Sequence, residues 1–225
     1  MGGIMSLILQ GSTSGSVTLQ EPAVAGTTVL TLPATSGTVA LTSQLLASPS
    51  AVGQIPFSTD GSTYTATAKI VSGTAVASTS GTSIDFTNIP SWVKRITVMY
   101  QGVSTDGTSD YWLRLGTSGG FATSGYVGYS ARQAASSNSY TAHSSSFVIV
   151  AGSPLATELF SGTIVLVNQT GNVWVVNGQL TGQSNNGNTN HTAGNISLSG
   201  VLTQVRLTSA TPNTFDAGSI NILYE

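Results

Sequence analysis

The sequence predicts an all-β protein: an N-terminal extended, interdigitated β-stalk with a core shared between copies of the chain, followed by a C-terminal antiparallel β-sandwich of jelly-roll type. Three observations support this prediction. Short runs of β-branched and aromatic residues recur along the chain. Turn dipeptides such as Asp106-Gly107 and Asn177-Gly178 separate these runs. No stretch shows the sustained apolar period of about 3.6 residues that marks an amphipathic helix.

The predicted stalk, residues 1–42, is rich in Gly, Ser and Thr, with short apolar bursts between them. No single burst carries enough apolar side chain to offset the entropy of ordering the backbone around it. Such a segment is either disordered or takes its core from neighbouring copies of the chain. A hydrophobic content of 40% argues against disorder for most of the chain. The residues predicted to attach or build the stalk are Ile4, Leu7, Leu9, Val17, Leu19, Leu30, Leu32, Val39 and Leu41.

Residues 43–70 are predicted to be a linker. Thr42 to Ala47 favour one or two helical turns before Pro49, and Asp60-Gly61 marks a turn.

Residues 71–225 are predicted to form one sandwich domain with about eight or more strands. Thr163–Val167 and Phe147–Val150 are unbroken runs, typical of strands buried on both faces. Other runs alternate in character. They are Ile84 to Phe86, Ile96 to Tyr100, Val201 to Leu207 and Ile220 to Tyr224, with a further unbroken run at Val173 to Val176.

Composition excludes several classes of partner. The net charge is −2 and the six basic residues are scattered, which disfavours binding to nucleic acid or to anionic lipid. There is no Cys, so disulfides and thiol-rich metal sites are excluded. The apolar patch from Ile4 to Leu9 is too short for a signal peptide or a transmembrane helix. We therefore expect neither Sec export nor membrane insertion.

Catalytic groups are sparse. Asp106 and Asp110 are the only close pair of acids, and a solvated hairpin turn is favoured over a hydrolytic or weak cation site. His143 and His191 lie in polar stretches and are expected in surface loops rather than in a triad or a metal site. We expect no enzyme activity, no cofactor and no metal site.

Two stretches have the composition of recognition surfaces. The first carries Tyr111, Trp112, Phe121, Tyr126 and Tyr129, because flat aromatic faces can stack on sugars. Core packing is the alternative for these rings, and it is the expectation for Trp92 and Trp174. The second is a predicted loop, Gly182–Asn195, with Asn185, Asn186, Asn190 and His191 as candidate contacts and a plain solvated loop as the alternative. Arg114 and Arg206 are expected to pair with Asp85 or Asp216, or to face a trimer axis.

Three segments resemble virion proteins of tailed bacteriophages. SGSVTLQEPAVAGTTVLTLPATSGTVALTSQ, in the opening zone, resembles a motif of tail fibres and other virion proteins. TNIPSWVKRITVMYQGVSTDGTSDYWLRLG (Thr87–Gly116) and TFDAGSINILYE (Thr214–Glu225) are similar to a C-terminal fibre module. The resemblance implies a homotrimer in the virion, attached through its N-terminus to other virion proteins, with the C-terminal domain projecting outward.

We therefore expect a short trimeric tail fibre, made in the bacterial cytoplasm, that binds a host glycan or receptor without cleaving it. A head fibre, collar fibre or capsid-decorating protein with no receptor role is the alternative. A glycan depolymerase is disfavoured by the shortage of carboxylates.

Overall fold

The computed structural model describes residues 7–10, 13–14, 16–19, 54–58, 64–68, 70–135, 137–183 and 188–225. Every regular element in these ranges is a β-strand and every strand pairing is antiparallel, which confirms the all-β prediction. The described ranges contain no helix that could serve as a membrane span. The chain divides into two compact units, Met1–Leu45 and Leu46–Glu225.

In the first unit, β1 (Leu7–Gln10) and β2 (Ser16–Leu19) form an antiparallel hairpin. The register sets Leu7 opposite Leu19 and Leu9 opposite Val17. The chain therefore turns back on itself here instead of continuing as one extended strand. The other predicted stalk residues, Ile4, Leu30, Leu32, Val39 and Leu41, lie outside the described residues.

The second unit begins with a hairpin that the sequence did not indicate. β3 (Gln54–Ser58) pairs with β4 (Tyr64–Ala68) inside the stretch predicted to be a linker. Pro56 is tolerated because a two-stranded hairpin leaves each strand with an open edge. The helical turn predicted at 42–47 lies outside the described residues.

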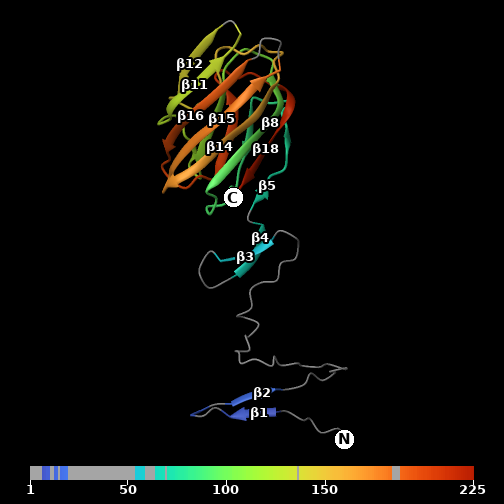
Figure 1. Ribbon diagram of the computed structural model, residues 1–225, viewed down its shortest axis with the longest axis vertical. Coiled ribbons are helices and arrows are strands. Elements are labelled where there is room, and N and C mark those ends of the chain that lie inside the picture. Colours follow the sequence, from blue (N-terminus) through green and yellow to red (C-terminus); the bar gives the residue numbers. More distant parts are fainter. Residues whose placement is uncertain are drawn as a thin grey trace. The chain divides into compact units, whose positions relative to one another are not determined.

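The rest of this unit is built from two antiparallel sheets (Figure 1). The larger has the order β12-β11-β16-β15-β14-β8-β18-β5, and β6 also pairs with β18. The smaller has the order β10-β9-β17-β7, and β13 also pairs with β9. The strands of the larger sheet are β5 (Val71–Ser72), β6 (Val76–Ala77), β8 (Arg95–Thr105), β11 (Val127–Gln133), β12 (Asn138–Ala142), β14 (Phe160–Thr170), β15 (Val173–Gly182), β16 (Thr189–Ser197) and β18 (Phe215–Tyr224). Those of the smaller are β7 (Ser83–Phe86), β9 (Tyr111–Thr117), β10 (Gly120–Phe121), β13 (Phe147–Val150) and β17 (Gln204–Ser209).

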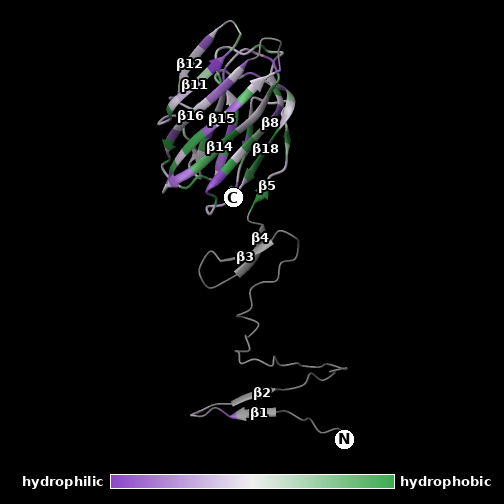
Figure 2. Ribbon diagram, in the orientation of Figure 1, coloured by the Kyte–Doolittle hydropathy of each residue, from purple (hydrophilic) through white to green (hydrophobic). Residues whose placement is uncertain are grey.

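One hydrophobic core fills the space between the two sheets. Ile96, Ile164 and Leu166 of the larger sheet join Leu113 and Leu115 of the smaller sheet in a single buried cluster. Since side chains alternate between the faces of a strand, each sheet also keeps an outer face. Figure 2 shows hydrophobic and hydrophilic segments alternating along the strands of the larger sheet.

The burial pattern corrects two predictions. Phe147–Val150 is buried at every position, as predicted. The runs Thr163–Val167 and Val173–Val176 are not buried on both faces, because Val167 and Val175 lie exposed on the outer face of the larger sheet. No described segment covers that face, so alternate residues of β14 and β15 meet solvent.

Candidate functional site

Two of the predicted contact aromatics, Tyr111 and Tyr126, belong to the core instead of a binding surface. Tyr111 packs edge-on against Phe160, with ring centroids 5.6 Å apart. The Tyr126 hydroxyl accepts a hydrogen bond from Leu115 N at 2.9 Å and donates one to Ala122 O at 3.2 Å. Burial raises the pKa of each phenol to about 12. Both rings are therefore inaccessible to a ligand.

The predicted amide-rich loop is shorter than expected. β15 continues to Gly182 and β16 begins at Thr189, so most of the stretch Gly182–Asn195 is strand. Asn190 is fully buried, and its Oδ1 accepts a hydrogen bond from Ala151 N at 2.9 Å. It therefore joins β16 to the end of β13 and does not face a ligand. Asn185 and Asn186 lie outside the described residues.

His143 is also buried, which corrects its expected place in a surface loop. Its Nδ1 accepts a hydrogen bond from Val148 N at 3.2 Å, and its Nε2 lies 3.2 Å from Thr192 Oγ1. The ring packs edge-on against Phe147. The imidazole therefore fills a place in the interior, where it helps to hold β13 against β16.

Asp106 and Asp110 each support a different part of the backbone. Asp106 Oδ1 accepts a hydrogen bond from Thr214 N at 2.8 Å. Asp110 Oδ1 accepts one from Ser153 N at 3.3 Å. Within the described ranges, no three His, Asp or Glu side chains form a group that could hold a metal ion.

The outer face of the larger sheet carries the most open aromatic surface. Tyr129 of β11 and Tyr140 of β12 are 64% and 75% exposed. The register sets Tyr129 opposite Ala142, and Tyr140 opposite Ala131, so the two tyrosines are diagonal neighbours on adjacent strands. Diagonal neighbours lie roughly 7 Å apart, within reach of one ligand.

A shallow hollow of about 330 Å³ lies beside these two rings. We call it the tyrosine groove; it is lined by Tyr129, Ala131, Tyr140, Asn177, Gly178, His191, Thr192 and Ala193. Small side chains form its floor, which leaves the tyrosines standing above the sheet. No Asp, Glu, Lys or Arg lines it.

Two polar side chains at the groove are available to a ligand. Asn177 and His191 are exposed, and their side chains make no hydrogen bond with any described residue. The sequence singled out Tyr129 and His191 but missed Tyr140 and Asn177. The signal for Tyr140 was a lone aromatic residue in the segment Asn138–Ala142, whose other four residues are all polar or small.

Trp112 and Phe121, the remaining aromatic candidates, lie half-buried on the outer face of the smaller sheet. The guanidinium of an arginine lies over each of these two rings. The Cζ atom of Arg114 lies 5.1 Å from the ring centroid of Trp112, and that of Arg206 lies 4.2 Å from Phe121. The sequence candidates that are not buried thus divide between the two outer faces of the sandwich and do not converge on one site.

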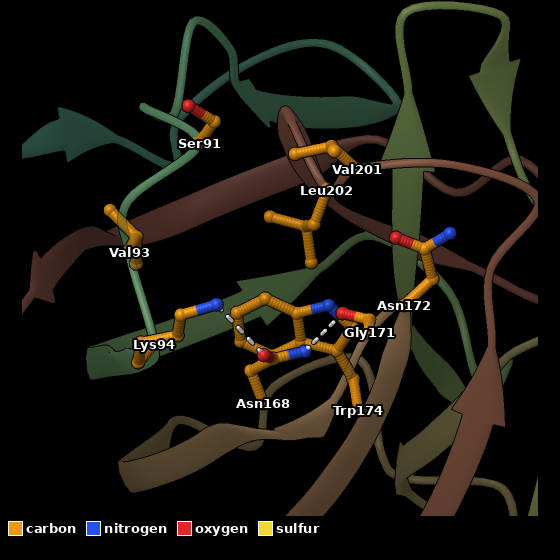
Figure 3. Close-up of a pocket in the computed structure, with 9 residues that line it drawn as sticks. All are labelled: Ser91, Val93, Lys94, Asn168, Gly171, Asn172, Trp174, Val201 and Leu202. Atoms are coloured by element: carbon orange, nitrogen blue, oxygen red, sulfur yellow. Dashed lines mark hydrogen bonds between the residues drawn. The ribbon is translucent and has the colours of Figure 1, made fainter. Parts of the chain in front are cut away.

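A further pocket lies between the segment Ser91–Lys94 that precedes β8, the turn that joins β14 to β15, and Val201 and Leu202 (Figure 3). Lys94 Nζ donates a hydrogen bond to Asn168 Oδ1 at 3.2 Å, and Asn168 Nδ2 donates one to Gly171 O at 2.9 Å. The volume of this pocket is about 60 Å³, whereas a water molecule occupies about 30 Å³ in the liquid. A pocket of this size is too small for a sugar ring.

Comparisons of the chain with protein-family models, with curated proteins and with solved structures found no match. Function is therefore inferred from the chemistry of the two outer faces and from the sequence.

Proposed function

We propose that this chain is a fibre protein of a tailed-bacteriophage virion and that its C-terminal sandwich binds a host-surface glycan without cleaving it. The tyrosine groove is the observation that carries the binding part of the proposal. The resemblance of the opening zone, of Thr87–Gly116 and of Thr214–Glu225 to fibre segments supports the virion part.

The groove has the composition that a sugar ligand requires. Aromatic rings offer apolar faces for the C–H surface of a sugar, and amide or imidazole groups bind its hydroxyls. Tyr129 and Tyr140 supply the rings, and Asn177 and His191 supply the polar groups. A sugar covering one face of a ring removes roughly 60 Å² from water, which contributes about 1.5 kcal/mol.

Binding without cleavage fits the same geometry. Hydrolysis of a glycosidic bond generally requires two carboxylates that flank it. The groove is lined by no carboxylate, so a glycan held there would lack the acid and the nucleophile or base.

A homotrimer fits the short N-terminal hairpin. An isolated two-stranded hairpin is marginally stable at best in water, and β1 and β2 have four residues each. Neighbouring copies would supply the missing packing. Three grooves on one fibre would also raise the avidity for a polymeric glycan far above the affinity of one groove.

The test is competition with adsorption. Purified full-length protein should block adsorption of its phage to host cells. The double variant Tyr129→Ala/Tyr140→Ala should lose about 3 kcal/mol of glycan-binding free energy per groove, or roughly a hundredfold in affinity. The control is Leu155→Ala/Val201→Ala, which truncates two exposed apolar residues elsewhere and should compete like the wild type.

The competing results are distinct. If the wild type fails to compete at saturating concentration, the receptor-binding proposal is wrong, and the architectural alternative replaces it. If the double tyrosine variant folds and competes like the wild type, the groove is not the binding site. Labelling the protein on intact virions by electron microscopy tests the virion assignment separately.

A further inference from the structure

We propose that the outer face of the smaller sheet holds a second site, in which Arg114 binds the carboxylate of an acidic sugar. We call this surface the arginine face; it comprises Asp85, Trp112, Arg114, Phe121 and Arg206. It lies on the other sheet from the tyrosine groove and shares no residue with it. The proposal does not depend on the function of the groove.

The backbone register brings two arginines together. Arg114 of β9 stands directly opposite Arg206 of β17. Like charges in directly opposite positions destabilise a sheet, so this pair requires compensation by negative charge. The chain itself supplies a negative charge for one of the two arginines.

Arg206 already holds a carboxylate. Its Nε and Nη2 donate hydrogen bonds of 2.7 and 2.6 Å to the two carboxylate oxygens of Asp85 on β7. The guanidinium also lies over the ring of Phe121. That ring occupies the space above Gly116, where a Cβ atom would lie 3.0 Å from Phe121 Cδ1. An arginine stacked on an aromatic ring is thus held in position to bind a planar carboxylate with two hydrogen bonds.

Arg114 also lies over an aromatic ring, but no carboxylate among the described residues binds its guanidinium. Its guanidinium lies over Trp112, and its Nε donates a hydrogen bond to Ser145 O at 3.2 Å. These two contacts fix the plane of the guanidinium. Its terminal amino groups make no hydrogen bond with any described residue. The side chain is only half-buried, so a ligand can reach these donors from solvent.

The charge of the face favours a ligand with a single negative charge. Asp85 neutralises one of the two arginines, which leaves one positive charge, that of Arg114. A sugar carboxylate is a monoanion with two oxygens in one plane, whereas a phosphate monoester carries about −1.5 to −2 at neutral pH. A uronic acid therefore fits both the charge and the planar donors of Arg114.

The test uses glucuronate and its uncharged counterpart, glucose, with the full-length protein. Saturation-transfer NMR should detect glucuronate binding in the wild type and no competition by glucose. Arg114→Gln should weaken the affinity at least tenfold. Arg114→Lys keeps the charge but loses the planar donors and should fall between the two. Binding should weaken as salt rises, because the attraction between the two charges is screened.

Two controls separate this site from other surfaces. Arg95→Gln removes an arginine that pairs with Glu225 away from the arginine face, and it should bind glucuronate like the wild type. The double variant Tyr129→Ala/Tyr140→Ala should also bind glucuronate at the arginine face, although it loses glycan binding at the tyrosine groove. A failure of the groove proposal is thereby distinguishable from a failure of this one.

Four outcomes would overturn the proposal. They are unchanged glucuronate binding in a folded Arg114→Gln variant, equal competition by glucose, stronger competition by inorganic phosphate than by glucuronate, and a change in oligomeric mass on Arg114→Gln. The last result would show that a second copy of the chain covers this face.

Discussion

Mild acid should destabilise the sandwich through His143, one of only two histidines in the chain. The His143 side chain is buried, with 6% of the residue exposed, and Val148 N donates a hydrogen bond to its Nδ1. Protonation places a hydrogen on Nδ1, so that two donors would face each other and this bond would break. His191, by contrast, is exposed on the outer face of β16.

The sign and the size of the effect follow from proton linkage. Burial lowers the pKa of His143 below its ordinary value of 6.5, although a backbone hydrogen bond with Ala193 opposes part of this shift. Below pH 6.5 the unfolded chain therefore binds a proton that the folded chain resists, and stability falls with pH. If the folded imidazole stays neutral, lowering the pH from about 7.5 to about 5.5 reduces the free energy of unfolding by at most about 1.4 kcal/mol.

Urea unfolding at fixed protein concentration, followed by tryptophan fluorescence, measures this loss. This pH range lies above the ordinary pKa values of Asp and Glu, so carboxylates contribute little to the change in stability. Wild type and His191→Asn should lose the same stability on acidification. His143→Asn should begin about 1–3 kcal/mol less stable, because it leaves buried partners unpaired, and should then show little pH dependence. The reasoning is refuted if His143→Asn loses as much stability as the wild type between these pH values.

Two further predictions concern the backbone and the assembly. Gly218→Ala should destabilise the sandwich by about 2–4 kcal/mol in thermal unfolding, because Gly218 has φ +89° and a Cβ atom there would lie 2.4 Å from Gly102 O. Gly200→Ala is the matched control, with its nearest neighbour 3.8 Å away, and should change little. Light scattering of the full-length protein should give three times the 22.8 kDa mass of one chain. A stable full-length monomer would contradict the shared-core interpretation of residues 1–42.

Strand positions were predictable from the sequence, and one ion pair was among the alternatives that it offered. In β17, Val205 and Leu207 point inward while Gln204 and Arg206 point outward, as their alternation indicates. Of the alternatives left open for Arg206, the structure shows the pairing with Asp85, because an outward arginine on one strand meets an outward acid on the next. Trp174 is buried, as its strand-like run predicts.

The burial of polar groups was not predictable, because it depends on hydrogen-bond partners on other strands. Tyr126, Asn190 and His143 lie in segments rich in Gly, Ser and Asn; this composition suggested surface positions for Asn190 and His143 and left both a contact role and core packing open for Tyr126. Each is buried because a backbone N–H reaches its side chain, such as Ala151 N at Asn190, 39 residues away. Composition shows that a side chain can form such a bond, but only the register shows that a donor is there.

The division of the aromatic candidates follows from strand parity. Along β9, the core residues Leu113 and Leu115 share a face with Tyr111, while Trp112 and Arg114 occupy the other face. Parity therefore separates Tyr111 from Trp112 even though they are adjacent in sequence, since neighbours in a strand point to opposite faces. The same rule groups Tyr129 with Val127 and Ala131 on the outer face of β11. Because a shift of register by one residue exchanges the two faces, the leucines that anchor β9 in the core also determine that Arg114 reaches solvent.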